Sequence, residues 1–331
     1  MENCIIEIAS GGYRQQPAVL EGIQWKTKRK GEAATLTFTC IKDKLLSFPE
    51  GAEVTFQYGN KNVFSGYVFQ KHRTKDQHIE VTCYDRTRYF KTKENYVFTG
   101  LRADQIITRI AMDMGIKIGH ISNTGYVIPK FAKSDTTMWD IIQEALDLTM
   151  METKVRYTMY DDFGKLCVKS QAEMYTDYLL DMDVAEDFDY TTSIDQNTYN
   201  QIVVKVPDGA PVIVEAQPTR DANGKRIPST IEQWGLLQHV TDVQNAENAL
   251  VKAQALLEIH NHVGCSLGVS GAFGDINVRA GSSVYLDMNL GDNHGNLHQM
   301  MIVDEVTHTF DNNDHYMDLT LKDGDKFYDE D

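Results

Sequence analysis

The sequence has few of the features that mark secreted, membrane or metal-binding proteins. Its 331 residues include only five cysteines, an odd number with no CxxC pair. Such sparse cysteines predict reduced, mostly buried thiols rather than a disulfide framework. No stretch is long and apolar enough for a transmembrane helix, and Met1–Glu7 lacks the basic segment of a signal peptide. We therefore expect synthesis in the cytoplasm and no membrane partner.

Positive charge is also scarce. The chain has 32 Lys or Arg against 48 Asp or Glu, a net charge of −16. This balance argues against broad binding to nucleic-acid backbones or to anionic membranes. Residues 1–100 nevertheless hold 15 basic and 11 acidic residues, which leaves 17 against 37 for the remainder. The local basic cluster at Lys26, Lys28, Arg29 and Lys30 either faces an acidic partner or, in the simpler interpretation, forms a solvated hairpin loop.

The length and a 42% hydrophobic content predict several domains with real cores. Residues 1–98 show the two-residue period of half-buried strands at Ala34–Cys40, Val54–Tyr58 and Ile79–Cys83. A turn at Gly59-Asn60 leads to a return strand over Val63–Gln70. We predict an N-terminal β-barrel module over residues 1–98.

The period changes near residue 100. One helical face is formed by apolar residues spaced three and four apart, namely Ala103, Ile106, Ile107, Ile110, Ala111 and Met114, and Gly115 ends it. A second helix begins near Thr136, with Ser134, Asp135 and Thr136 as capping candidates. A hairpin follows around Asp161–Gly164. These elements predict a small α+β domain over residues 99–175.

The remaining chain divides into two predicted parts. Residues 176–244 form an acidic, β-rich domain with strands at Tyr199–Val206 and Val212–Ala216 and an exposed loop at Asp221–Gly224. Its acidic run from Asp177 to Asp195 is a solvated surface or the lining of a channel. Residues 245–331 combine a helix over Asn245–Asn261 with a second β region. The buried stripe of that helix comprises Ala246, Ala249, Leu250, Ala253, Leu256, Leu257 and His260.

The last β region repeats the order of the first. Gly51–Phe56 has a counterpart in Gly281–Leu286, Val63–His72 in Met300–His308, and Ile79–Asp85 in Met317–Asp323. Any two antiparallel meanders share some of this pattern. The sharper interpretation is a duplicated β-barrel or sandwich module at the two chain ends. A trimer of such chains would present six modules in a ring, because head-to-tail contacts close by rotation.

At this point the sequence resembles a known family. The stretches that carry the likeness are Tyr84–Arg86, Thr99–Ile107, Met114–Gly119, Thr124–Lys130, Trp139–Leu146, Asn200–Lys205, Ile231–Gln238 and Asn248–Glu258. As an ordered set they resemble the baseplate hub proteins of contractile tails, in the PBSX-prophage XkdQ/YqbQ-like group of late-control-D-like hubs. One departure is Trp234, where the pattern favours the smaller tyrosine.

The resemblance implies a fold and a role. The fold is β-rich, multi-domain α+β, with two tube-like β-barrel modules flanking α+β middle domains. The role is that of a structural hub subunit of a contractile phage tail or a tail-like bacteriocin. It would form a homotrimer that adapts the sixfold tail tube to the threefold spike. The implied partners are the tail tube protein, the central spike protein and a LysM-bearing baseplate neighbour.

Several short motifs invite a chemical interpretation. His260 and His262 lie about 200° apart on a helix, a poor arrangement for one metal ion. Asp311–Asp318 lacks the central glycine and final glutamate of a calcium loop, so a hairpin turn between Phe310 and Tyr316 is favoured. Asp162-Phe163-Gly164 predicts a turn, and Gly271–Gly274 precedes no helix. We assign no catalytic, cofactor or metal residue.

Two other functions compete with the hub. The first is a tail-associated peptidoglycan hydrolase, since the abundant carboxylates do not exclude a lysozyme-type pair. The second is a soluble binding module unrelated to tails. Neither has its own motif in the sequence, and the individual interface residues of the hub are unknown at this stage.

Overall fold

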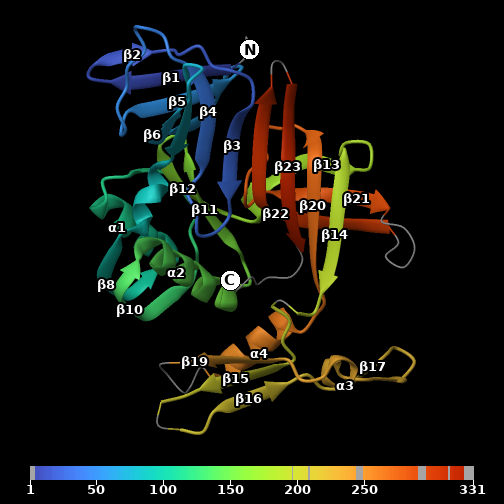
Figure 1. The fold of residues 1–331 in the computed structure, drawn as a ribbon. Helices are drawn as coiled ribbons and strands as arrows, with labels where there is room; N and C mark the ends of the chain where they lie inside the picture. The colour runs from blue at the N-terminus through green and yellow to red at the C-terminus, as the bar shows by residue number, and fades with distance from the viewer. Residues whose placement is uncertain are drawn as a thin grey trace. The chain divides into compact units, whose positions relative to one another are not determined.

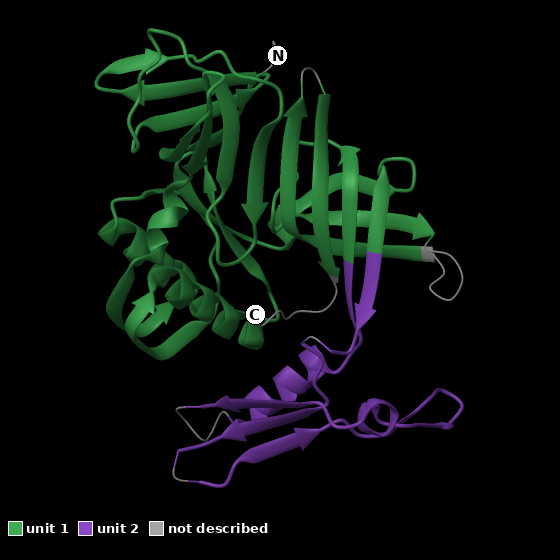
Figure 2. Cartoon of the chain, viewed as in Figure 1, with its two compact units in different colours: residues 1–189, 267–324 green, residues 190–266, 325–331 purple. Residues whose placement is uncertain are grey.

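The computed structural model describes residues 4–195, 197–207, 209–243, 249–289, 296–311 and 314–323. The chain divides into two compact units, residues 1–189 with 267–324 and residues 190–266 with 325–331 (Figure 2). The finer division into four domains stays a prediction. In the described residues, no helix is both long and apolar enough to cross a membrane.

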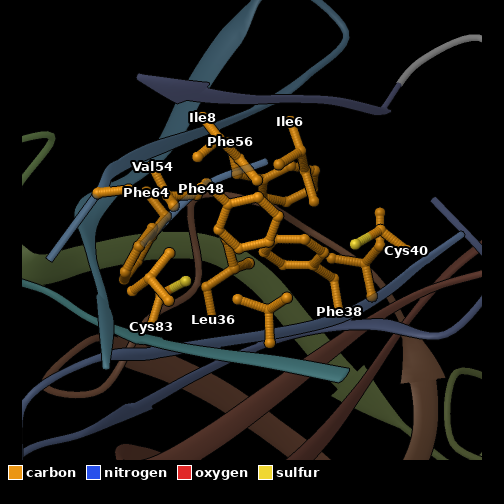
Figure 3. Packing of buried hydrophobic residues seen from close by; sticks show 14 of the residues in the cluster. Ile6, Ile8, Leu36, Phe38, Cys40, Phe48, Val54, Phe56, Phe64 and Cys83 are labelled. Carbon is orange, nitrogen blue, oxygen red and sulfur yellow. The ribbon is translucent and has the colours of Figure 1, made fainter. Parts of the chain in front are cut away.

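The first unit begins with an antiparallel β module. Its strands are β1 (Cys4–Ser10), β2 (Tyr13–Gln15), β3 (Ile23–Lys28), β4 (Thr35–Ile41), β5 (Glu53–Tyr58), β6 (Lys61–Arg73) and β7 (His78–Tyr84). Their apolar faces meet in a core that contains Phe38, Phe56 and Phe64 (Figure 3). The three predicted strands and the return strand are therefore confirmed. The strands β1, β2 and β3 were not predicted.

A small α+β part follows. Its elements are η1 (Arg86–Lys91), β8 (Lys93–Arg102), α1 (Ala103–Asp113), β9 (Lys117–Ile121), β10 (Val127–Thr137), α2 (Met138–Thr153), β11 (Tyr157–Asp162), β12 (Lys165–Ser170) and η2 (Ala172–Met174). The apolar stripe of α1 is buried, and Gly115 follows with φ +67°. The predicted cap of α2 is corrected by one residue, because Thr137 accepts the backbone N–H of Asp140.

The C-terminal part of the unit is a second β module. Its strands are β13 (Tyr175–Asp181), β14 (Asp187–Ser193), β20 (Gly264–Phe273), β21 (Ser283–Asn289), β22 (Asn296–Asp311) and β23 (Asp314–Asp323). The predicted acidic run thus contains two strands, β13 and β14. Its acidic residues alternate with partly buried Phe188 and Tyr190. A half-exposed strand of this kind presents its charges to water on one face.

All these β-module strands belong to one sheet. Its order is β14-β20-β23-β22-β3-β4-β7-β6-β5-β1-β2, and β13 and β21 branch from β22 (Figure 1). The path is open among the described residues, so the predicted closure of each module into a barrel is not confirmed. The β-rich, multi-domain α+β class is confirmed.

The second unit is smaller. It holds a three-stranded sheet in the order β16-β15-β19 and a short hairpin of β17 and β18. The bounds are β15 (Gln201–Lys205), β16 (Val212–Glu215), β17 (Thr219–Arg220), β18 (Arg226–Ile227), α3 (Thr230–Trp234), β19 (Gln238–Asp242) and α4 (Ala249–His260). Residues 245–248 of the predicted third helix, including Ala246, lie outside the described residues. Leu250, predicted as buried, is 51% exposed, and Ile259 is buried instead.

Candidate functional site

The two β modules share one strand order. The N-terminal module runs β3-β4-β7-β6-β5-β1, and the C-terminal module runs β14-β20-β23-β22-β21-β13. Each strand of the first has its counterpart at the same place in the chain order of the second. A coincidence between two meanders explains neighbouring hairpins, but it does not explain six strands in the same non-sequential order. The predicted repeat is therefore a repeat of topology.

The repeat extends to single hydrogen bonds. The N–H of Gly51 donates to the carbonyl oxygen of Val68 at 2.7 Å, and Gly281 donates to Val303 at 2.7 Å. The N–H of Val68 donates in turn to the carbonyl of Ala52 at 2.9 Å, and Val303 to that of Ser282 at 2.9 Å. Both glycines have positive φ, +82° and +92°, which glycine adopts without steric cost.

A β-bulge occurs at the same place in both modules. The β6–β7 pairing passes from Val68↔Cys83 to Gln70↔Thr82 and so bulges Phe69. The β22–β23 pairing passes from Val303↔Leu321 to Glu305↔Thr320 and bulges Asp304. Val68 therefore corresponds to Val303. This register moves the predicted match of Val63–His72 with Met300–His308 by one to two residues.

The modules differ in one strand direction and in one side chain. β1 pairs antiparallel with β5, whereas its counterpart β13 pairs parallel with β21. The bulged residue is Phe69 in one module and Asp304 in the other. Phe69 lies at an exposed surface, whereas the side chain of Asp304 is only 15% exposed. The same backbone thus supports a different contact in each module.

Asp304 lies where the modules join within the chain. There β22 pairs antiparallel with β3, from Glu305↔Lys28 to Phe310↔Ile23. The guanidinium of Arg29, 5% exposed, lies 3.0 Å from Asp304 Oδ1, and the Arg29 N–H donates to the Asp304 carbonyl at 2.9 Å. Lys322 Nζ contacts the other carboxylate oxygen at 3.1 Å. This buried ion pair fixes the register of the junction.

The junction corrects the interpretation of the basic cluster as a solvated loop. Lys26 and Lys28 lie in β3, and Lys26 Nζ is 2.6 Å from Glu305. Lys30 lies 3.8 Å from Asp147 of α2. The charges face acidic groups of the same chain because the alternate residues of β3, Ile23 and Trp25, are buried. The acidic groups that these side chains meet belong to the same chain, and the alternative of a separate acidic partner stays a prediction.

Aromatic residues cross the junction. Phe310 of β22 belongs to the core of the N-terminal module, with its ring centroid 5.0 Å from that of Phe56. His308 stacks on Trp25 at 4.7 Å. One His308 nitrogen lies 2.9 Å from the Val278 carbonyl oxygen and the other 2.9 Å from His315. Burial lowers the pKa of His308 to about 3, so this imidazole is neutral.

A buried charged cluster lies beneath the junction. Arg279 stacks 3.8 Å from the centroid of Tyr160 and donates to the Asp161 carbonyl at 3.0 Å. Burial, reinforced by the charge of Asp85, raises the pKa of Asp161 to about 7. Burial also raises the pKa of Asp85 to about 6. The adjoining hollow is about 20 Å³, room for about one water but not for a sugar ring.

The sequence motifs do not converge on a reaction centre. His260 ends α4 and its Nδ1 lies 2.9 Å from the Asn197 carbonyl oxygen; His262 lies two residues beyond. No group of three or more His, Cys, Asp or Glu side chains among the described residues could hold a metal ion. All five cysteines are described, none forms a disulfide, and Cys40, Cys83 and Cys167 are buried.

The Asp162-Phe163-Gly164 motif is a turn, as predicted, and the glycine-rich motif lies mostly within a strand. Phe163 and Gly164 connect β11 to β12, with the Gly164 N–H bonded to Asp161. Asp311 pairs with Asp314 across the β22–β23 hairpin, and residues 312–313 lie outside the described residues. The motif Gly271–Gly274 begins within β20, where Gly271 donates to Asp318 at 3.0 Å.

Nothing in the sequence marked the junction as such. Asp304 and Glu305 carry no motif, since each is a common charged residue in a strand, and Arg29 stood out only as a member of the basic cluster. The alternation of Ile23 and Trp25 with Gln24 and Lys26 was the one signal available for β3. The residues that are equivalent in the two β modules could be matched only from the order of the strands in the sheet.

The chain is similar to proteins of phage tails. A family model described as YQBQ-like matches residues 23–322. The phage-like element PBSX protein XkdQ of Bacillus subtilis (strain 168) is 30% identical over 309 residues, which cover 91% of this chain and 90% of XkdQ. The 43 kDa tail protein of prophage MuSo2 from Shewanella oneidensis has a TM-score of 0.70 at 15% identity, covering 98% of this chain and 100% of that one.

A tail protein from Neisseria meningitidis MC58 has a TM-score of 0.71 at 12% identity, with 98% of each chain covered. At these identities the two solved structures show a shared fold. The match to XkdQ, together with the family model, confirms the resemblance inferred from the ordered sequence stretches. This chain belongs to the YQBQ-like family.

Proposed function

We propose that the chain is a structural subunit of the baseplate hub of a contractile phage tail or tail-like particle. In this proposal three copies form a ring whose six tube-like β modules continue the sixfold tail tube and hold the threefold spike. The observation that carries the proposal is the repeated module, with the same strand order, glycine turn and bulge at both chain ends. Because each chain carries two equivalent modules, a ring of three chains presents six similar modules and can contact a threefold object and a sixfold object.

The comparisons support the tail assignment. XkdQ is named as a protein of a phage-like element, and the two solved relatives are named as tail proteins. We extend this tail assignment to the present chain and propose three partners for it: the tail tube protein, the central spike protein and a LysM-bearing neighbour. After synthesis in the host cytoplasm, the subunit would be assembled into the baseplate.

The role is mechanical and electrostatic. Three chains of −16 each carry −48 formal charges. An acidic channel would repel passing DNA, because like charges across a narrow lumen prevent sticking. Asp183, Glu186, Asp187 and Asp189 are exposed, as such a surface requires. No specific nucleic-acid binding is part of the proposal.

The competing function is peptidoglycan hydrolysis. Its general acid would be a carboxyl of raised pKa within reach of a sugar polymer. The carboxyls of raised pKa, Asp85 and Asp161, are buried beside a hollow of about 20 Å³. This geometry favours the structural role. Release of reducing sugars from purified cell walls by the purified chain would support the hydrolase instead.

Labelling of the native particle tests the location. A gold-labelled tag on the chain is expected at the distal end of the tail tube in negative-stain images, with three copies per particle by quantitative mass spectrometry. Label along the sheath, or one copy per particle, would contradict the hub.

A further inference from the structure

Three parts of the first unit meet around the small hollow beneath the junction. Asp85 follows β7 of the N-terminal module, and Asp161 lies in β11 of the α+β part. Arg279 and Ala280 lie in the loop between β20 and β21 of the C-terminal module. All four residues line the same hollow, which has a volume of about 20 Å³. A ligand in this hollow therefore lies against all three parts at once.

Close packing fixes the walls of the hollow. A Cβ atom on Gly281 would lie 2.5 Å from Thr158 Cγ2, so the loop before β21 packs directly against β11. The N–H of Ala280 donates to Thr27 Oγ1 of β3 at 2.9 Å. Packed walls of this kind relax only partly around a gap, because their backbone and side chains are held by other contacts. The hollow is therefore a fixed feature of the fold.

Two side chains of the wall each keep one polar atom without a hydrogen-bond partner among the described residues. These atoms are Asp161 Oδ2 and Arg279 Nε, and both are closed to solvent. Other atoms of the same groups are satisfied, because Asp161 Oδ1 accepts the N–H of Gly164 and Arg279 Nη2 donates to the Asp161 carbonyl at 3.0 Å. Asp161 as a whole is only 7% exposed. An unsatisfied buried polar atom is rare and costly, so two of them beside one hollow point to a ligand.

We propose that the hollow is a binding site for one water molecule, which hydrogen-bonds Asp161 Oδ2, accepts the N–H of Arg279 Nε and so links the α+β part to the C-terminal module. A hollow of about 20 Å³ admits about one water. Buried waters make about three hydrogen bonds. Asp85 Oδ2 is available as the third partner, since it accepts the N–H of Ala34 at 3.2 Å and a carboxylate oxygen has two lone pairs.

The mixed charges of the wall select a neutral ligand. A chloride ion would accept the N–H of Arg279, but it would be repelled by the carboxylates of Asp85 and Asp161. A sodium or ammonium ion would be attracted by the carboxylates, but it would face the N–H of a guanidinium cation and has no lone pair to accept it. Water both donates and accepts, so it alone of these small ligands satisfies both sides of the hollow.

Water also suits both protonation states of Asp161. Burial, reinforced by the charge of Asp85, raises the pKa of Asp161 to about 7, so both states are present near neutral pH. Water donates to the charged carboxylate and accepts from the protonated carboxyl, because it can turn within the site. The hollow therefore keeps its ligand while Asp161 titrates.

Diffraction from crystals of the full chain at about 1.5 Å tests the site directly. At pH 5 and at pH 8, one solvent peak is expected within about 2.7–3.2 Å of both Asp161 Oδ2 and Arg279 Nε. An anomalous signal at this peak in bromide-grown crystals would identify an anion, and contacts shorter than about 2.6 Å would identify a metal cation. Either of these results, or a hollow without density, would overturn the water site.

Relaxation dispersion of ¹⁷O-labelled water counts long-lived buried waters in solution. Ala280→Ser places a hydroxyl group at the wall of the hollow, where it can take over both hydrogen bonds, and is expected to lower the count by about one. Ala111→Ser, at a fully buried alanine of α1, is the matched control and should leave the count unchanged. An equal count in wild type and folded Ala280→Ser would overturn the proposal. If thermal melts show that Ala280→Ser does not fold, the diffraction result decides.

Discussion

The two β modules have the same backbone but meet different neighbours. In the C-terminal module the bulged residue, Asp304, lies inside a junction and holds Arg29 and Lys322. In the N-terminal module the bulged residue, Phe69, is 36% exposed and lies beyond the last β6 residue that pairs with β5, Tyr67. The glycine turns and carbonyl hydrogen bonds are the same in both, since they set the register of the strands. The comparison teaches that the two modules share the same strand register, whereas the side chain at the bulge differs according to the surface that it contacts.

Truncation of the two bulged residues is expected to give the largest contrast. Asp304→Ala should lower the free energy of unfolding by about 3–5 kcal/mol, because it removes the buried carboxylate that contacts both Arg29 and Lys322. Phe69→Ala should cost about 1–2 kcal/mol, because Phe69 is 36% exposed and loses only a partly buried ring. Chemical denaturation of both variants measures the difference. Similar losses would show that the two positions are not in different environments.

The second-largest difference in stability is expected between alanine variants of the two turn glycines, Gly51 and Gly281. Gly51→Ala introduces only the strain of a positive φ, about 1–2 kcal/mol, since its new Cβ meets nothing within 4 Å. Gly281→Ala adds a contact of 2.5 Å with Thr158 Cγ2 and should cost about 1–2 kcal/mol more. Thr158→Ala removes the two nearest atoms, Cγ2 and Oγ1 at 2.5 and 2.7 Å, and serves as the rescue. If Gly281→Ala and Gly51→Ala melt alike, the close packing at Gly281 is wrong.

Acid should destabilise the fold through two buried histidines of the C-terminal module, His308 and His315. Burial lowers the pKa of His308 to about 3 and that of His315 to about 4, from 6.5. Their neutral forms stabilise the fold above pH 6.5, and this stability is lost as the pH falls through 6.5 toward 4. We expect a loss of about 2 kcal/mol between pH 6.5 and 4.5. In thermal melts the variant His315→Gln, whose amide does not titrate, should lose less stability as the pH falls; an unchanged slope would exclude His315 as a source of the acid effect.

The smallest effect is expected at the buried carboxyl beside the junction. Because the pKa of Asp161 is raised to about 7, its protonated form stabilises the fold at low pH. That contribution is present below pH 3.8 and is lost as the pH rises through 7. Asp161→Asn should therefore raise the stability at pH 8 by about 1 kcal/mol and change little at pH 5. Destabilisation at pH 8 would mean that the charged carboxylate is needed by Arg279.

Part of this repeat was visible in the sequence. Gly51–Phe56 and Gly281–Leu286 each combine a glycine with alternating apolar residues. Both features are present in both copies because the turn favours glycine and a strand with one buried face requires apolar residues at every second position. The helices over Ala103–Asp113 and Met138–Thr153 were predicted for the same reason. Local periodicity therefore predicted most elements of the first unit.

The other half of the repeat was not predictable. The charges of β3 were interpreted as a solvated loop, and β14 as an acidic surface, because neither has a run of apolar residues. Both are strands because partners distant in the chain supply their hydrogen bonds, β22 for one and β20 for the other. The junction depends on pairings across about 280 residues, such as Lys28 with Glu305, which no local pattern encodes.

Electron cryomicroscopy of the assembled hub on its tail tube tests the repeated module most directly. The account predicts three copies of the chain around one axis, with N- and C-terminal modules alternating at six similar positions. A ring in which only one module of each chain contacts the tube, or in which the two modules occupy dissimilar positions, would contradict it.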